Sequence, residues 1–250
     1  MNLTQTPENI LNIPMRPMDK DRILEKINKY ISTQCVFRHI VSLNPEILVM
    51  AQDDEEYRNI LSQGDIQIVD GVGIAIGGSI LGIDVGKRVT GVDLMENILQ
   101  DLNHSGLRVM LLGGGENIAE KIVLCYKKKY PHISFYGMRG ISSIQDPHMT
   151  EEAAIFSIVA DYKPQILFVA FGSPWQEKWI WNHRGELAGV ICMGVGGGFD
   201  FVSGKVARAP HFLRSIGLEW FYRLMRQPWR VRRQIRLIRF MLLIFKQKFF

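Results

Sequence analysis

The feature that most constrains the fold of this chain is the alternation of short apolar runs with longer amphipathic segments. Most of the runs are continuously apolar, which is typical of strands buried on both faces of a parallel sheet. Segments with helical spacing separate them, as in chains built from strand–helix–strand units. The predicted strands are 36–43, 66–69, 107–112, 133–136, 166–171 and 190–195. The sequence therefore predicts an α/β fold with a mostly parallel, Rossmann-like sheet and helices on both faces.

The segments between these strands are predicted to be helical. Pro45 stands where it can begin a helix that runs to about Ser62, because the N–H that proline lacks has no helical partner there. Asp53 and Asp54 fall inside that helix and are expected to be solvated. Residues 1–18 are expected to form a loose leader. The other predicted helices are 19–32, 71–81, 93–103, 116–130, 150–161 and 175–185.

The chain is basic, and its positive charge is concentrated at the C-terminus. Its 250 residues carry a formal net charge of +5. From Arg214 onwards, eight arginines and two lysines stand against one acid, Glu219, so the preceding part of the chain is slightly acidic. Since the composition changes after Pro210, we predict an α/β domain over 1–210 and a C-terminal appendage over 211–250.

The appendage contains a predicted helix from Trp229 to about Lys248 with a basic and an apolar face. Such a helix is typical of segments that lie in a membrane interface, so we expect an anionic membrane surface as a partner. The preceding aromatic segment, 212–224, is expected to pack on the protein instead. The alternative that both segments pack as ordinary surface helices remains open. The apolar face is formed by Val231, Ile235, Ile238, Leu242 and Phe245, and another face carries Arg232, Arg236 and Arg239.

Several classes of site are missing from the sequence. Cys35, Cys125 and Cys192 are far apart and form no CxxC pair, which favours a reducing compartment over a disulfide framework or a zinc site. The histidines form no HExxH pattern, and no DxD pair of the kind that holds a metal ion and a diphosphate is recognised, so no metal site is predicted. The first residues do not have the pattern of a signal peptide, and no run has the roughly 18 apolar residues expected of a membrane-spanning helix.

Polar residues gather at the predicted strand ends, where open α/β sheets bind ligands. Asp70 follows the strand at 66–69 and precedes Gly71 and Gly73, whose lack of side chains lets a ligand approach the backbone. These residues also have structural explanations, since Asp70 or Asn44 would equally cap the helix that follows it. The remaining strand-end candidates are Ser42, Arg88, Thr90, Ser173, Gln176, Glu177 and Asp200.

The turn Gly113-Gly114-Gly115 is a further candidate for ligand binding. It resembles the start of a GxGxxG dinucleotide loop, but the third glycine is missing, since Ala119 or Glu120 stands at its position. No acidic residue ends a following strand about 20 residues later, as that fingerprint requires. A dinucleotide-dependent oxidoreductase is therefore an alternative interpretation rather than the main one.

Eight short motifs follow one another through residues 35–240. They are SLNPE (42–46), DGVGI (70–74), KRVTGVDL (87–94), LLGGG (111–115), FGSPWQEKW (171–179), GVGGGFDFVSG (194–204), RAP (208–210) and GLEWFYRL (217–224). In this combination the chain resembles the WecG/TagA/CpsF family of glycosyltransferases. The resemblance implies an inverting, metal-independent bacterial enzyme without a cofactor. It implies transfer of N-acetylmannosamine, its uronic acid or a hexose from a UDP-sugar to a saccharide on a polyprenyl diphosphate lipid, at the cytoplasmic face of the cell membrane.

The resemblance also assigns roles to individual residues. Asp70 matches the proposed general base of the family, and Ser42 replaces a threonine while keeping the hydroxyl. Since arginine can bind a phosphate through two parallel hydrogen bonds, several tail arginines are candidates for contact with a diphosphate or the membrane. The residues expected to bind substrate are Asn44, Arg88, Gly113, Gly114, Gln176, Asp200 and Arg208. The tail candidates are Arg223, Arg230, Arg232, Arg233 and Arg236.

One departure from the family pattern concerns the nucleotide base. Members often carry the sequence GYF after the fourth strand, with an aromatic ring near the nucleotide. Gly140-Ile141-Ser142 stands in that place here, which leaves the stacking partner of the base undefined.

Two functions other than catalysis remain open as alternatives. The chain could serve as a membrane-surface adaptor without chemistry, or its arginine-rich tail could bind nucleic acid. The apolar face of the tail suits lipid better than nucleic acid, so no nucleic-acid partner is predicted. A homo-oligomer is compatible with the sequence.

Overall fold

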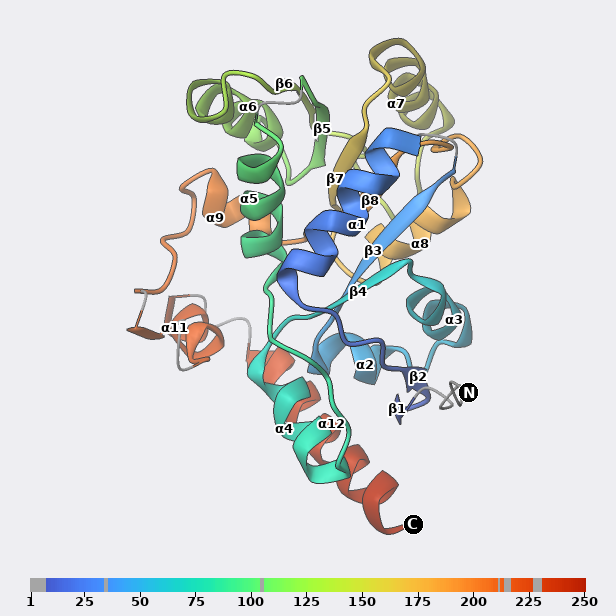
Figure 1. The fold of residues 1–250 in the computed structure, drawn as a ribbon, viewed down its shortest axis with the longest axis vertical. Helices are drawn as coiled ribbons and strands as arrows, with labels where there is room; N and C mark the ends of the chain where they lie inside the picture. The colour runs from blue at the N-terminus through green and yellow to red at the C-terminus, as the bar shows by residue number, and fades with distance from the viewer. Residues whose placement is uncertain (1–7, 34–35, 104–105, 211, 214–216, 227–230) are drawn as a thin grey trace. The chain divides into compact units, whose positions relative to one another are not determined.

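The computed structural model describes residues 8–33, 36–103, 106–210, 212–213, 217–226 and 231–250, with 231–234 described by their backbone alone. In this part of the chain the main sheet has six strands in the order β4-β3-β8-β7-β5-β6, flanked by helices (Figure 1). Its strands are β3 (Arg38–Leu43), β4 (Ile66–Val69), β5 (Arg108–Gly113), β6 (Ser134–Met138), β7 (Ile166–Ala170) and β8 (Ile191–Gly194). The predicted α/β fold is confirmed.

The chain divides into two compact units, each made of separate segments. Unit 1 consists of Met1–Asp19, Ser42–Thr90 and Arg208–Phe250, and unit 2 consists of Lys20–Val41 and Gly91–Ala207.

Unit 2 is built on parallel strands. β5 pairs with β7 on one side and with β6 on the other, so that Val109 is in register with both Ile166 and Phe135. β7 pairs in parallel with β8. The helices of this unit are α1 (Lys20–Thr33), α5 (Gly91–Asp101), α6 (Ile118–Lys129), α7 (Met149–Tyr162), α8 (Trp175–Asn182) and α9 (Gly198–Val202). The short helix α9 was not predicted.

The strands of unit 2 are buried along almost their whole length, which explains their continuous apolar sequences. One core cluster joins alternate residues of β5, β7 and β8 to the inner sides of α7 and α8. Its strand members are Met110, Leu112, Leu167, Val169 and Cys192, and its helix members include Ile155, Val159, Trp179 and Ile180. Because alternate strand residues point to this face of the sheet, the residues between them point to the opposite face and pack against the helices there.

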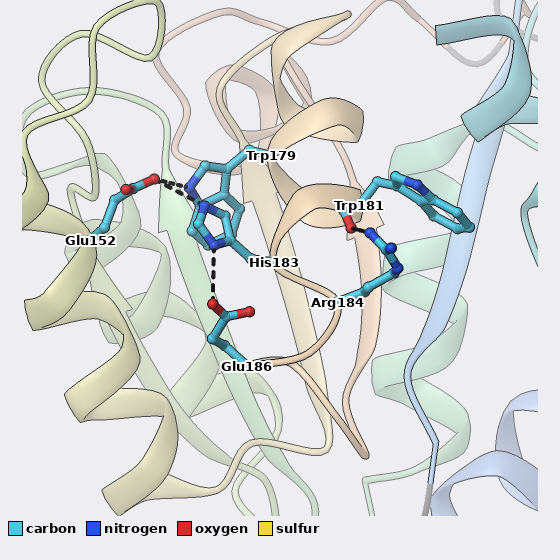
Figure 2. A network of polar contacts seen from close by, with 6 residues as sticks. All are labelled: Glu152, Trp179, Trp181, His183, Arg184 and Glu186. Carbon is cyan, nitrogen blue, oxygen red and sulfur yellow. Dashed lines mark hydrogen bonds and ion pairs between the residues drawn. The ribbon is translucent and has the colours of Figure 1, made fainter. Parts of the chain in front are cut away.

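Glu152 joins α7 to α8 through a small polar network (Figure 2). Its Oε1 accepts a hydrogen bond from Trp179 Nε1 at 3.0 Å and lies 3.0 Å from His183 Nε2. Phe156 of α7 stacks on the Trp179 ring, with 5.7 Å between the ring centroids. These contacts hold α7 against α8, and they thereby fix the end of the loop 139–148 that leads into α7.

Unit 1 begins with an ordered N-terminal segment. It contains β1 (Asn9–Ile10) and β2 (Ile13–Pro14), which pair in antiparallel fashion, and the side chains of Ile10 and Ile13 are fully buried. The guanidinium of Arg16 donates a hydrogen bond to the Gly64 carbonyl oxygen at 3.0 Å. The expected loose leader is therefore wrong for residues 8–18, where an apolar hairpin was overlooked because it is so short.

The predicted helix 45–62 is in fact two helices, α2 (Pro45–Met50) and α3 (Glu55–Gln63). Asp54 begins the second one, because its Oδ1 accepts a hydrogen bond from the Tyr57 N–H at 2.9 Å. Asp53 binds Arg239 through two hydrogen bonds of 2.5 and 2.7 Å, and these bonds lower the pKa of Asp53. Asp54 is thus a helix cap, while Asp53 is exposed, as expected, but lies between the two helices and pairs with Arg239.

The C-terminal helix α12 (Val231–Phe249) packs along α4 (Val72–Leu81) and α2 (Figure 1). α4 carries Gly73 and Gly77 one turn apart, and a Cβ atom on Gly77 would lie 2.9 Å from Phe240 Cζ. Phe240 and Ile244 are fully buried. The glycines thus form a groove on α4 that admits the side chains of α12, so the tail helix is docked on one face.

The packing of the tail differs from expectation in α11 and agrees with it on one face of α12. α11 (Glu219–Arg226) was expected to pack, yet it has no buried residue, and Trp220 and Phe221 are 40% and 47% exposed. The apolar face of α12 that was expected to meet lipid is exposed at Ile235, Ile238, Leu242 and Phe245, whereas a second apolar face, with Phe240 and Ile244, packs on the protein. Among the described residues, no helix combines the length and the apolar character needed to cross a membrane.

We expect Gly77→Val to lower the free energy of unfolding by about 1–3 kcal/mol, the usual cost of overpacking a core. The added side chain would meet Phe240 and Ile244, both of which are buried. Ser79→Val is the matched control, because Ser79 is exposed on the same helix. Urea unfolding followed by circular dichroism measures both variants, and equal stabilities would contradict the packing of α12 on α4.

Candidate functional site

The predicted residues around Asp70 come together at one edge of unit 1. The Asp70 N–H donates to the Leu43 carbonyl oxygen at 2.8 Å, which joins the end of β4 to the end of β3. The Val89 N–H donates to the Val69 carbonyl oxygen at 3.0 Å, which lays the loop 84–90 against the end of β4. The predicted residues that share this edge are Ser42, Asn44, Asp70, Arg88 and Thr90.

Ser42 and Asp70 differ in their surroundings. Ser42 is 9% exposed, and within the described part of the chain its Oγ has no hydrogen-bond partner. A buried polar group left without a partner costs roughly 1–3 kcal/mol, so a bound molecule that satisfies it would be stabilised. Asp70 is half-buried, which lets its carboxylate meet a ligand without being sealed in the core.

Asn44 has the structural role that the sequence left open as an alternative. Its Oδ1 accepts a hydrogen bond from the Ile47 N–H at 3.0 Å and caps α2, with Pro45 as the first helical residue. One lone pair of this oxygen is therefore engaged in the cap, which leaves the second lone pair and the amide nitrogen for a contact with substrate.

Arg88 and Arg208 connect the segments 208–210 and 217–219 to the same edge of unit 1. The Arg208 guanidinium donates to Thr90 Oγ1 at 3.4 Å and to Glu219 Oε1 at 3.3 Å. A Cβ atom on Gly217 would lie 3.1 Å from Arg88 Nη1, so the backbone there passes close to the arginine. Two arginines thus stand beside the edge that carries the Asp70 carboxylate.

The other tail arginines are distributed differently. Arg236 donates a hydrogen bond of 2.5 Å to Glu46 Oε1 on α2, so its charge is already paired. Arg223 lies on α11 and is half-buried. The side chains of Arg232 and Arg233, and all of Arg230, lie outside the described residues.

Unit 2 contains a cavity of about 220 Å³ at the C-terminal ends of β5, β6 and β7. The predicted Gly113 and Gly114 line it, with φ angles of 100° and 84° that favour glycine. The other lining residues are Gly115, Arg139, Ile141, Ser142, Ile144, Ala170 and Phe171.

The position of this cavity follows from the strand order. β5 leads through α6 to β6, while β7 leads through α8 to β8, and β6 and β8 lie on opposite sides of the β5–β7 pair. The chain therefore leaves these two neighbouring strands in opposite directions. Such a switch point is where open α/β sheets bind ligands.

Sequence reasoning missed several residues of this cavity, most notably Arg139 and Phe171. Arg139 directly follows β6, so the strand-end rule that selected Asp70 would also have selected it. The sequence predicts Phe171 as the last residue of a strand, whereas β7 ends one residue earlier. Its ring gives the cavity an aromatic wall in place of the one that Ile141 and Ser142 do not provide.

Gln176 does not reach into the cavity but joins two strand-end turns. Its Oε1 accepts hydrogen bonds from the Gly172 N–H at 3.1 Å and the Gly196 N–H at 3.0 Å. Its Nε2 donates to Glu177 Oε1 at 2.7 Å and to Ser173 Oγ at 3.2 Å. Gln176 and Glu177 are 3% and 1% exposed. The side chain predicted to bind substrate thus holds the loops after β7 and β8 together.

Asp200 lies half-buried on α9 in unit 2, with its Oδ1 3.7 Å from Lys205 Nζ. It is therefore in a different unit from Asp70 and Arg88. Among the residues that the structure describes, no three His, Cys, Asp or Glu side chains form a group that could hold a metal ion.

Comparison with known proteins matches residues 8–250 to the model of the glycosyl transferase WecG/TagA/CpsF family. This match covers nearly the whole chain. The chain belongs to this family.

Curated relatives agree with the family match. A Bacillus subtilis (strain 168) protein named N-acetylglucosaminyldiphosphoundecaprenol N-acetyl-beta-D-mannosaminyltransferase is 30% identical over 241 residues, 96% of this chain and 92% of the relative. A Staphylococcus aureus (strain NCTC 8325 / PS 47) protein of the same name is 29% identical over 203 residues, 81% of this chain and 78% of the relative. The predicted family and the predicted glycosyltransferase class are confirmed, and the oxidoreductase interpretation is set aside.

In this glycosyltransferase, we expect Gln176→Ala to lower the free energy of unfolding by about 1–3 kcal/mol. The variant removes the acceptor of two backbone N–H groups and leaves them unsatisfied. Gln63→Ala is the control, since Gln63 is exposed. Thermal or urea unfolding separates the two roles, because a residue that acted on substrate alone would leave the stability unchanged.

Proposed function

We propose that this protein is an inverting, metal-independent glycosyltransferase that uses a UDP-sugar and an acceptor saccharide linked to a polyprenyl diphosphate. The observation that carries the proposal is the grouping of Asp70 with Ser42, Arg88 and Thr90 at one edge of unit 1. Membership of the family restricts the chemistry to glycosyl transfer. The pathway would be the synthesis of a bacterial surface polysaccharide.

The relatives' names guide the choice of substrates. They combine N-acetylglucosaminyldiphosphoundecaprenol with an N-acetyl-beta-D-mannosaminyl group. We therefore propose N-acetylmannosamine as the first donor sugar to test, followed by its uronic acid and by hexoses.

Asp70 would act as the general base. It takes the proton of the acceptor hydroxyl, whose oxygen forms a bond to the anomeric carbon of the donor. The bond from that carbon to the UDP oxygen breaks, and its electron pair leaves with UDP. A positioned base typically accelerates such a step about 10²–10⁴-fold. The buried Ser42 hydroxyl would bind the acceptor at the same edge.

Arg88 and Arg208 would hold the diphosphate of the lipid acceptor. A Cβ atom on Gly217 would lie 3.0 Å from Val72 Cβ in the first turn of α4 and 3.1 Å from Arg88 Nη1, and Arg208 bonds to Thr90 in the same loop as Arg88. The N-cap residue of α4, Gly71, provides no side-chain hydrogen bond to the first turn. The backbone N–H groups and dipole at the start of a helix favour an anion. Two guanidinium groups add charge-assisted hydrogen bonds to the same anion.

The cavity of unit 2 would take the base and ribose of the donor. Its walls combine apolar side chains with glycine backbone, which suits a flat, weakly polar ring. Its volume of about 220 Å³ is below the roughly 300–1,000 Å³ of pockets that enclose a whole drug-sized ligand. The cavity therefore suits one end of a UDP-sugar rather than all of it.

Asp70→Asn should lower the transfer rate by at least about 10²-fold, because the amide cannot accept the proton. The affinity for UDP should stay unchanged, since the substitution keeps the shape of the side chain. Asp161→Asn, at an exposed position of α7, is the control. The assay follows sugar transfer to a short-chain polyprenyl-diphosphate-linked N-acetylglucosamine, and UDP binding is measured by calorimetry.

The outcomes of that assay separate two failures. Near-normal transfer by Asp70→Asn would contradict the assignment of the base. A wild-type protein that binds the acceptor lipid but transfers no sugar from any UDP-sugar would contradict the donor class.

The outer face of α12 supports a peripheral contact with the cytoplasmic face of the cell membrane. It presents a stripe of exposed apolar side chains, with Ile235 and Ile238 each 64% exposed and Leu242 65% exposed. Lys246 and Lys248 are exposed near the end of the same helix. Each basic residue near an anionic surface contributes about 1 kcal/mol of attraction. We propose that this stripe and these lysines lie in an anionic lipid interface, which brings the protein to its lipid-linked acceptor.

The double variant Ile238→Ser, Leu242→Ser should reduce co-sedimentation with phosphatidylglycerol-containing vesicles several-fold, because less apolar surface is buried in the interface. It should fold normally, since both side chains are exposed. Leu124→Ser is the matched control, because Leu124 is 66% exposed on α6 of unit 2. Equal vesicle binding by all three proteins would contradict the membrane role of the stripe.

A further inference from the structure

The cavity at the ends of β5, β6 and β7 contains a single source of charge. Of the described residues that line it, only Arg139 has a charged side chain. Arg139 directly follows β6 and is exposed, so its guanidinium can reach a ligand at the mouth of the cavity. The remaining lining is glycine backbone, small or apolar side chains and one hydroxyl.

The loop that carries Arg139 is held in place on both sides. A Cβ atom on Gly140 would lie 2.8 Å from Phe171 Cε1 and 2.9 Å from Leu112 Cδ1, so the backbone at Gly140 rests directly on β5 and the aromatic wall. The Ser142 N–H donates to the Glu151 carboxylate on α7 at 3.2 Å. The backbone position of Arg139 is therefore set before any ligand binds.

The hydrogen bonds from Ser142 also act on the carboxyl group of Glu151. They lower the pKa of Glu151, chiefly through the Ser142 hydroxyl. The same hydrogen bonds therefore favour the ionised carboxylate that accepts them. Glu151 is not among the residues that line the cavity, and Arg139 is the described lining residue that gives the cavity positive charge.

A nucleoside diphosphate fits this distribution of groups in one orientation. The apolar walls formed by Ile141, Ile144 and Phe171 suit the base. A diphosphate cannot be placed among them without losing its hydration, because a buried charge without a partner is strongly unfavourable. With the base inside, the diphosphate lies toward the mouth, where the exposed guanidinium is available.

We propose that Arg139 binds the diphosphate of the donor nucleotide, an inference that rests on the proposed function. The planar guanidinium can donate two parallel hydrogen bonds to phosphate oxygens, which lysine cannot do. When the bond between the anomeric carbon and the UDP oxygen breaks, negative charge develops on the diphosphate. A fixed cation at this position stabilises that charge as well as the bound donor.

The test compares UDP with uridine by calorimetry on the full-length protein. Arg139→Ala should weaken UDP binding about 10- to 100-fold, the effect of losing a charge-assisted pair of hydrogen bonds, and leave uridine binding unchanged. Arg139→Lys should fall between the wild type and Arg139→Ala, because it keeps the charge but not the fork geometry. Arg184→Ala is the matched control, since Arg184 is an exposed arginine of unit 2 outside the cavity lining.

Two results would overturn the inference. Wild-type affinity of Arg139→Ala for UDP would show that the guanidinium does not bind the diphosphate. An equal loss for UDP and uridine would show that Arg139 acts on the base or on the shape of the cavity. Either result leaves the proposed function intact as long as the wild type binds UDP and transfers sugar, whereas a wild type that does neither would contradict the proposed function itself.

Discussion

The parallel direction of the strands is the constraint on which the rest of this structure depends. In unit 2 it places the ends of β5, β6 and β7 at one edge, so that three loops distant in sequence enclose one cavity. In unit 1 the bond from Asp70 to Leu43 does the same for the ends of β3 and β4. The chemistry-bearing residues are therefore loop residues whose positions are set by buried strands.

The sequence predicted the strands closely and the helices less well, for a physical reason. A strand buried on both faces needs a continuous apolar run, and 66–69 and 166–170 show it plainly. The break between α2 and α3 depends on one side-chain cap at Asp54, which the apolar spacing of the region conceals. In the tail, the stripe through Ile238 was recognised, but Phe240 and Ile244 form a second apolar face that only the groove of α4 reveals.

The sequence predicts where the candidate site residues lie more closely than what their side chains do. The strand-end rule located Ser42 and Asp70, because parallel strands force such residues to one edge. Arg88 lies in the loop between α4 and α5, which reaches the same edge through the bond from Val89 to Val69. The strand-end rule could not tell a ligand-binding side chain from one that supports the loops, and Gln176 proved to be engaged with backbone N–H groups. Arg139 directly follows β6 and satisfies the same rule, but no neighbouring motif marks it as a ligand-binding residue.

The close approach of Gly77 to Phe240 has a consequence for sequence variation within the family. The two positions are 163 residues apart, yet the space for the ring exists only because α4 lacks a side chain there. A member with a larger residue at the first position would need a smaller one at the second, and a drift at either site alone would be selected against. We therefore expect the two positions to covary.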